Sequence, residues 1–167
     1  IIKIGKIDET ECIKIIDCKE KHILPGVIDT QVHFREPGLS HKEDIYSGTN
    51  SALLGGVTTI FEMPNTSPAT INKKELEKKL KIAKKSSWVN YSFFIGACKE
   101  NLNKLSKLEK LKGCSGIKIF MGSSTGTLLL SEEKDLATAL KTCKRRVALH
   151  SEDEFRLKER FQLIDKK

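Results

Sequence analysis

Residues 26–35 read GVIDTQVHFR, a short apolar run that becomes polar toward its end. Alternate side chains of an extended strand point to the same face, which places four polar groups together: Asp29, Gln31, His33 and Arg35. A buried parallel strand has no ordinary reason to carry them, because each polar group buried without a partner costs free energy. The pattern therefore indicates a functional strand end or, as the alternative, an edge strand or loop with solvated side chains.

Similar β-rich segments recur along the chain, with midpoints about 30 residues apart. They cover residues 26–33, 57–63, 89–95, 116–121 and 147–150. Helical patterns fill the gaps between them, with apolar residues at helical spacing. Strands that alternate with helices in this way predict consecutive βα units on a parallel sheet.

Several helix boundaries are predicted from short motifs. Ser40 and Ser151 are each followed three residues later by a glutamate, which is the pattern of a capping box. Ser131 precedes another apolar stripe and is expected to cap a further helix. Leucines at every third position predict one more helix over residues 102–111.

Residues 1–24 differ in character from the rest of the chain. Residues 1–6 and 12–16 resemble two short strands joined by a polar turn at residues 8–10. Two strands are not stable alone, so we expect residues 1–24 to be part of a small β subdomain. Residues 25–167 would contribute the five βα units.

Five βα units are compatible with two architectures. An open doubly wound sheet would be complete at this length, whereas a (β/α)₈ barrel needs about 250 residues. Neither a G-x-G-x-x-G motif nor a P-loop follows any predicted strand, so a nucleotide-binding open sheet loses its best support. Topology alone leaves the choice open, and the residues at the strand ends favour the barrel.

The composition is that of a globular protein, with 38% hydrophobic and 31% charged residues among 167. The formal charge of +8 arises from lysines that alternate with leucines, so solvated helix faces explain it and no nucleic-acid partner is expected. No apolar run reaches the ~20 residues of a membrane span, and no signal-peptide pattern opens the sequence. Five scattered cysteines without a C-x-x-C motif argue against a disulfide scaffold and favour a cytoplasmic location.

Two more polar residues fall in predicted strands or at their ends. Lys118 lies within the apolar run 116–120, and His150 closes the run 147–150. A desolvated lysine has a lowered pKa and can take up CO₂ as a carbamate, which turns a cation into a metal-bridging anion. Each residue alone has an ordinary explanation, as an exposed edge lysine or a hydrogen-bonded histidine. Together with His33 they fit two imidazoles and a lysine carbamate around one or two divalent cations.

The same stretches carry a resemblance to a known family. Residues 25–38, PGVIDTQVHFREPG, resemble the metal-binding opening motif of dihydroorotases, which are members of the amidohydrolase superfamily. Three further segments are similar to later parts of that family. They are GGVTT and EMPNT (55–59 and 62–66, the second strand and its loop), GIKIFM (116–121, the strand of the carboxylated lysine) and ALHSED (148–153, the strand of the next metal histidine).

The resemblance implies an amidohydrolase-type TIM barrel, of which this chain would form the first five βα units. It implies a zinc-dependent enzyme that interconverts dihydroorotate and N-carbamoyl-aspartate in pyrimidine biosynthesis. His33 would bind the more buried metal, His150 would bind the second, and Lys118 as a carbamate would bridge one or two zinc ions.

The resemblance also assigns substrate contacts. Arg35 and Asn65 would hold the carboxylate of the substrate, by a bidentate fork and an amide donor respectively. Hydantoinases and allantoinases act on rings without this carboxylate, and their motifs lack the Arg-Glu-Pro-Gly continuation at residues 35–38. Asp29 would support the metal histidines without binding the metal itself.

The sequence departs from the family pattern in two respects. Gln31 stands where the family has the first histidine of His-x-His, and an amide oxygen is a weaker zinc ligand, so the buried metal is expected to bind loosely, be absent or use other ligands. The later metal histidine and the aspartate general base have no counterpart in these 167 residues. We therefore expect the chain to be inactive alone and to form a homo-oligomer or need a partner chain.

Two alternative functions stay open at this point. One is a non-catalytic dihydroorotase-like protein that supports a partner enzyme by binding it, which Gln31 favours and the retained Lys118, His150 and Arg35 oppose. The other is a related cyclic amidohydrolase, an allantoinase or a hydantoinase, which a panel of substrates would reveal.

Overall fold

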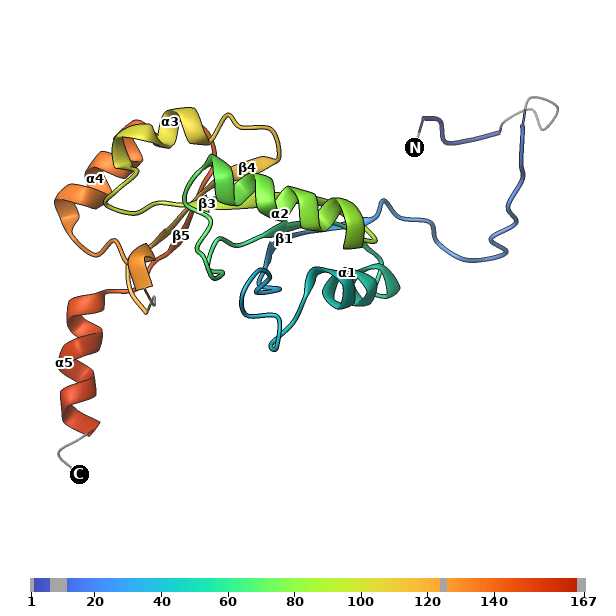
Figure 1. The fold of residues 1–167 in the computed structure, drawn as a ribbon. Helices are drawn as coiled ribbons and strands as arrows, with labels where there is room; N and C mark the ends of the chain where they lie inside the picture. Colours follow the sequence, from blue (N-terminus) through green and yellow to red (C-terminus); the bar gives the residue numbers. More distant parts are fainter. Residues whose placement is uncertain (1, 7–11, 124–125, 165–167) are drawn as a thin grey trace.

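The computed structural model describes residues 2–6, 12–123 and 126–164 (Figure 1). Strands and helices alternate along the chain, as the sequence predicts. The strands are β1 (Val27–Val32), β2 (Val57–Glu62), β3 (Asn90–Gly96), β4 (Cys114–Phe120) and β5 (Val147–His150). The α-helices are α1 (Ile45–Leu54), α2 (Lys73–Ser86), α3 (Leu105–Leu108), α4 (Glu133–Thr142) and α5 (Glu154–Ile164), with short 3₁₀ helices η2 (Leu102–Lys104) and η3 (Gly126–Leu128).

The order of the strands in the sheet identifies the architecture. All four neighbouring pairs are parallel, and the order is β1-β2-β3-β4-β5. A doubly wound sheet reverses its strand order at a switch point, whereas a barrel adds each new strand on the same side. The five strands therefore form part of a TIM barrel, as the sequence predicts.

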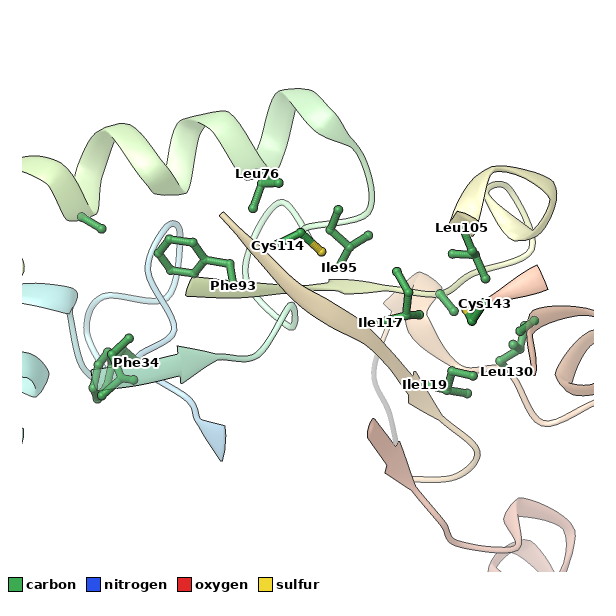
Figure 2. Close-up of a cluster of buried hydrophobic side chains, with 14 of the residues drawn as sticks. Phe34, Leu76, Phe93, Ile95, Leu105, Cys114, Ile117, Ile119, Leu130 and Cys143 are labelled. Carbon is green, nitrogen blue, oxygen red and sulfur yellow. The ribbon is translucent and has the colours of Figure 1, made fainter. Parts of the chain in front are cut away.

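The main core lies between the sheet and the helices that cover its outer face. Strand residues such as Phe93, Ile95, Ile117 and Ile119 are buried there together with Leu76 and Leu105 of the covering helices (Figure 2). Successive side chains of a strand point to opposite faces. Lys118, which lies between two of these core residues, therefore faces the inner side of the sheet, where a barrel places its site.

Residues 2–6 and 12–24 contain no strand in the structure. The strand predicted for residues 12–16 is therefore wrong, as is the described part of the one predicted for residues 1–6, while the turn at 8–10 lies outside the described residues. A short apolar segment becomes a strand only when another backbone pairs with it. Figure 1 shows this segment extending away from the sheet, and Ile2 and Ile13 are fully exposed. The proposed β subdomain at residues 1–24 stays a prediction.

The residues that cap the helices differ from the prediction. Asp44, not Ser40, caps α1, since its Oδ1 accepts a 2.7 Å hydrogen bond from the Ser47 amide. Asp153, not Ser151, accepts hydrogen bonds from the first backbone amides of α5. In both cases an acidic residue lies closer to the first helical turn, and a carboxylate there is also favoured by the helix dipole.

Two other helices also differ from their predicted form. Helix α4 begins after Glu132, without a side-chain cap, so the prediction that Ser131 caps it is wrong. The helix predicted over residues 102–111 is shorter, because η2 precedes it and α3 ends at Leu108. No helix in the described part of the chain has the length and apolar character that a membrane crossing needs.

The capping assignment can be tested with a matched pair of variants. Asp44→Ala is expected to lower the free energy of unfolding by about 1 kcal/mol, because it removes the acceptor for a helix-start amide. Ser40→Ala should leave it unchanged. Denaturant unfolding of both variants measures the difference, and an equal loss in Ser40→Ala would contradict the assignment.

The candidate active site

The predicted site residues lie at or near the C-terminal ends of the strands. His33 follows β1 directly, Asn65 lies in the loop after β2, Lys118 lies in β4, and His150 is the last residue of β5. Because the strands are parallel, their C-terminal ends meet at the same edge, where barrel enzymes place their active sites.

His33 and Asn65 are held together across two neighbouring strands. Nδ1 of His33 lies 2.8 Å from Oδ1 of Asn65. An amide oxygen can only accept, so Nδ1 donates its proton and Nε2 keeps the lone pair that can bind a metal. Burial lowers the pKa of His33, against the effect of the Asn65 hydrogen bond, so the ring is neutral at physiological pH. The Asn65 amide nitrogen keeps two N–H groups that can donate to a ligand.

Arg35 occupies a strained position beside Asn65. Its φ is +67°, and its Nη1 donates to the Asn65 carbonyl oxygen over 3.5 Å. A non-glycine residue in the left-handed region costs about 1 kcal/mol, and such residues cluster at functional sites. The following Glu36 anchors the loop, since its Oε2 accepts a 2.9 Å hydrogen bond from the Ile45 amide at the start of α1. The loop thus holds the guanidinium beside the amide of Asn65.

A cavity of about 360 Å³ borders both Arg35 and Asn65. Ligand pockets usually range from about 300 to 1,000 Å³, so a small ring compound could be accommodated. Its lining also includes Leu39, Lys42, Thr66 and Leu128. Positive charge, amide N–H groups and apolar surface therefore meet in one space, which suits a small organic anion.

Lys118 is almost completely buried in the centre of β4, with 1% of its surface exposed. Its Nζ lies 5.1 Å from the centroid of the Phe120 ring. Burial lowers the pKa of Lys118, which increases the share of the neutral amine that reacts with CO₂. The positive charge of Lys118 also lowers the pKa of His33, so the two side chains interact electrostatically.

His150 lies next to Phe120, its partner in the β4–β5 register, with the two ring centroids 6.0 Å apart. Its Nε2 lies 2.7 Å from Oε2 of Glu152. The pKa of Glu152 is lowered, first by a hydrogen bond from Ser123 and then by the one from His150. Phe120 therefore contacts both Lys118 and His150, and Nδ1 of His150 is the ring nitrogen left for a metal.

The described residues contain no group of three or more His, Cys, Asp or Glu side chains arranged to hold a metal. The donors at this edge are Nε2 of His33, Nδ1 of His150 and the amine of Lys118. As a carbamate, the lysine would add oxygen ligands, and zinc takes such mixed nitrogen and oxygen sets while keeping a position open for water. In its chemistry this donor set would suit zinc once Lys118 is carboxylated, and metal binding by these residues stays a prediction.

Gln31 and Asp29 are less closely connected to this site. Both are exposed, and Oδ1 of Asp29 accepts a 3.0 Å hydrogen bond from the Gln31 amide. The register between β1 and β2 shifts between Asp29 and Val32, so strict alternation does not continue to His33 and Arg35. A supporting role for Asp29 toward the histidines, and metal binding by Gln31, stay predictions.

Sequence reasoning missed a buried ion pair behind the site, formed by Glu62 and Lys79. Lys79 lies on the buried side of α2 with Leu76 and Ala83. By residue type alone it cannot be told apart from the neighbouring lysines, which lie on the solvated face of the helix. Its position at apolar spacing on the helix was the available signal.

Comparisons with known proteins agree on the relatives of this chain. A family model described as Dihydro-orotase-like matches residues 20–152. A dihydroorotase of Methanosarcina mazei is 41% identical over 158 residues, which are 92% of this chain and 34% of the relative. A dihydroorotase of Methanosarcina acetivorans is 38% identical over 157 residues, with similar coverage.

A solved structure shows the same arrangement of elements. The L-hydantoinase (dihydropyrimidinase) from Arthrobacter aurescens matches with a TM-score of 0.77 and 26% sequence identity, over 85% of this chain and 32% of that one. The chain thus spans about a third of the length of the curated relatives it matches. Because the family model covers most of its residues, this chain belongs to the dihydroorotase-like family.

Proposed function

We propose that the protein in which this chain occurs is a zinc-dependent dihydroorotase, which interconverts dihydroorotate and N-carbamoyl-aspartate in pyrimidine biosynthesis. The observation that carries the proposal is the contact between His33 and Asn65 with Arg35 beside them. One amide orients a metal-binding imidazole through its oxygen and offers its N–H groups to a carboxylate. Family membership supports the same reading.

Arg35 and Asn65 would recognise the carboxylate that distinguishes dihydroorotate from simpler cyclic amides. A guanidinium can form two parallel hydrogen bonds to a carboxylate, and the Asn65 amide adds a third donor. The adjoining cavity of about 360 Å³ has room for the ring. This clamp favours dihydroorotate over hydantoin or allantoin as the substrate.

Nε2 of His33, Nδ1 of His150 and a carbamate on Lys118 would hold one or two zinc ions. Zinc bound there would supply Lewis-acid activation of water and of the ring amide carbonyl. The contribution of Lys118 is covalent: its neutral amine adds to CO₂, an N–C bond forms, and one proton is released. Burial of Lys118 supports this step, because a lowered pKa leaves more of the amine neutral.

The proposal includes a cytoplasmic location. Cys98, Cys114 and Cys143 are buried free thiols, and burial raises the pKa of all three, that of Cys143 to about 11. Free thiols suit a reducing compartment.

It also includes assembly as a homo-oligomer or with a partner chain, besides the small-molecule substrate. Apolar side chains of α5, such as Phe155 and Phe161, are more than half exposed, as is Val27 on the outer strand β1. Exposed strand edges and apolar faces of this kind are normally covered by further polypeptide, either of the same protein or of a second chain.

A substrate panel tests the proposal on the full-length protein, with zinc and bicarbonate supplied. We expect kcat/KM for dihydroorotate to exceed that for dihydrouracil, hydantoin and allantoin by at least about 100-fold, because a site built for a carboxylate rejects rings without one. A chelator should abolish turnover, and zinc should restore it. Preferred hydrolysis of allantoin or hydantoin would identify a related amidohydrolase, whereas no turnover of any ring would favour the non-catalytic supporting role.

A further inference from the structure

Glu62 and Lys79 form an ion pair with only 1% and 0% of their side chains exposed. Lys79 lies on α2, and its Nζ lies 4.9 Å from the centroid of the Phe93 ring. Burial raises the pKa of Glu62 and lowers that of Lys79, while their mutual attraction opposes both shifts. Buried ion pairs are often no more stabilising than apolar residues of similar size, so stability alone does not account for this one.

The lysine of this pair holds the segment that carries Asn65. Nζ of Lys79 donates a 3.0 Å hydrogen bond to the carbonyl oxygen of Met63, two residues before Asn65. The Met63 amide in turn donates to the Val32 carbonyl oxygen at 3.0 Å. Lys79 thus restrains the chain between the end of β2 and the amide that contacts His33.

The glutamate of the pair lies beside the strand that leads to the other half of the clamp. Glu62 is the last residue of β2 and is paired in register with Val32, directly before His33. The positive charge of Arg35 lowers the pKa of Glu62, so the carboxylate and the strained residue of the first loop interact electrostatically. Through Met63, the buried pair is therefore linked to both loops that carry the carboxylate-binding groups.

We propose that Glu62 and Lys79 are positioning residues, which fix the loop of Asn65 against the loop of Arg35 and so set the geometry of the carboxylate clamp. The inference rests on the proposed function and deepens it. Neither residue touches the substrate. An apolar pair could fill the same volume, but it could not donate the hydrogen bond that holds the Met63 carbonyl. A shift of about 1 Å in a positioned group can cost about 100-fold in rate.

The test uses Lys79→Met in the full-length protein, with Lys81→Met as the matched control on the exposed side of the same helix. In Lys79→Met we expect KM for dihydroorotate and Kd for orotate, a carboxylated ring, each to rise by on the order of 10-fold. Turnover of dihydrouracil, which lacks the carboxylate, should fall by a smaller factor, because this ring depends on the Asn65 loop only through the orientation of His33. Lys81→Met should match the unaltered protein in every measurement.

A double variant separates positioning from folding. Lys79→Met alone leaves a buried carboxylate without its partner, whereas Glu62→Gln with Lys79→Met removes both charges and should fold. We expect the double variant to keep the weakened binding of orotate. Orotate binding as tight as in the unaltered protein, or equal losses on both rings, would show that the pair is merely structural.

The outcomes separate this inference from the proposed function. Normal turnover of dihydroorotate, combined with unchanged KM and Kd in the folded variants, would overturn only the positioning role. No turnover and no orotate binding in the unaltered protein would overturn the proposed function and the inference with it.

Discussion

Lys118→Met in the full-length protein is expected to lower kcat for dihydroorotate by on the order of 1,000-fold or more, because the variant cannot form the carbamate that completes the metal ligands. Stability should change in the opposite direction. Lys118 is buried over the Phe120 ring. In the metal-free protein without CO₂, replacing its desolvated ammonium by an apolar side chain of similar length should raise the free energy of unfolding by roughly 1 kcal/mol. Steady-state kinetics measure the first effect, denaturant unfolding measures the second, and zinc content shows whether the metal site is lost.

Lys110→Met is the matched control, since Lys110 is exposed and lies shortly before β4. It should change neither turnover nor stability. Near-normal turnover by Lys118→Met would exclude the carbamate, and a large loss of stability would show that the buried ammonium has a structural role.

The lowered pKa of Lys118 also predicts how CO₂ uptake depends on pH. Burial lowers this pKa below its ordinary value of 10.5, so the amine becomes neutral at a lower pH than an exposed lysine. After removal of CO₂, the rate at which activity returns at a constant concentration of dissolved CO₂ should reach half its maximum below pH 10.5. Between the two pKa values the unfolded state binds more protons, so the destabilising effect of Lys118 should decrease as the pH rises through that window. A half-maximal rate at or above pH 10.5 would contradict the burial effect.

Arg35→Lys is expected to lower kcat/KM for dihydroorotate by about 10- to 100-fold, with most of the loss in KM. Lysine keeps the positive charge but lacks the planar fork that binds a carboxylate through two hydrogen bonds. The backbone strain at φ +67° is the same for both residues, so the change tests the side chain alone. Turnover of dihydrouracil should be unaffected, because this ring has no carboxylate to bind.

A conservative change far from the site provides the comparison for Arg35. Arg160→Lys, on the exposed surface of α5, makes the same chemical replacement and should leave both substrates unchanged. If Arg35→Lys lowers turnover of dihydroorotate and dihydrouracil by the same factor, Arg35 is structural and the carboxylate clamp is wrong.

The alternation of strands and helices was determined by the sequence alone. Short apolar runs, and apolar residues at helical spacing between them, are local signals in the sequence. The five strands therefore fall within about two residues of their predicted bounds, and β5 matches residues 147–150 in full. The polar residues that interrupt or end these runs were equally visible. The candidate site residues could therefore be selected before their contacts were known, namely His33, Arg35, Asn65, Lys118 and His150.

Contacts between distant segments were decided only by the tertiary structure. The strand order, which separates a barrel from a doubly wound sheet, depends on which backbones pair and not on local preference. The apolar residues Ile13, Ile15 and Ile16 have strand character but form no strand in the described structure. Helix caps depend on which of two nearby polar side chains reaches the first free amide, which selected Asp44 over Ser40.

The internal connections of the site also required the fold. Asn65 reaches His33 across 32 residues of sequence, and Lys79 reaches the end of β2 from the next helix. A lysine buried by packing and a lysine on a solvated helix face have the same local sequence pattern, because burial is set by the neighbouring strands. The sequence thus determined which groups stand at the strand ends, and only packing across the sheet determined which of them meet.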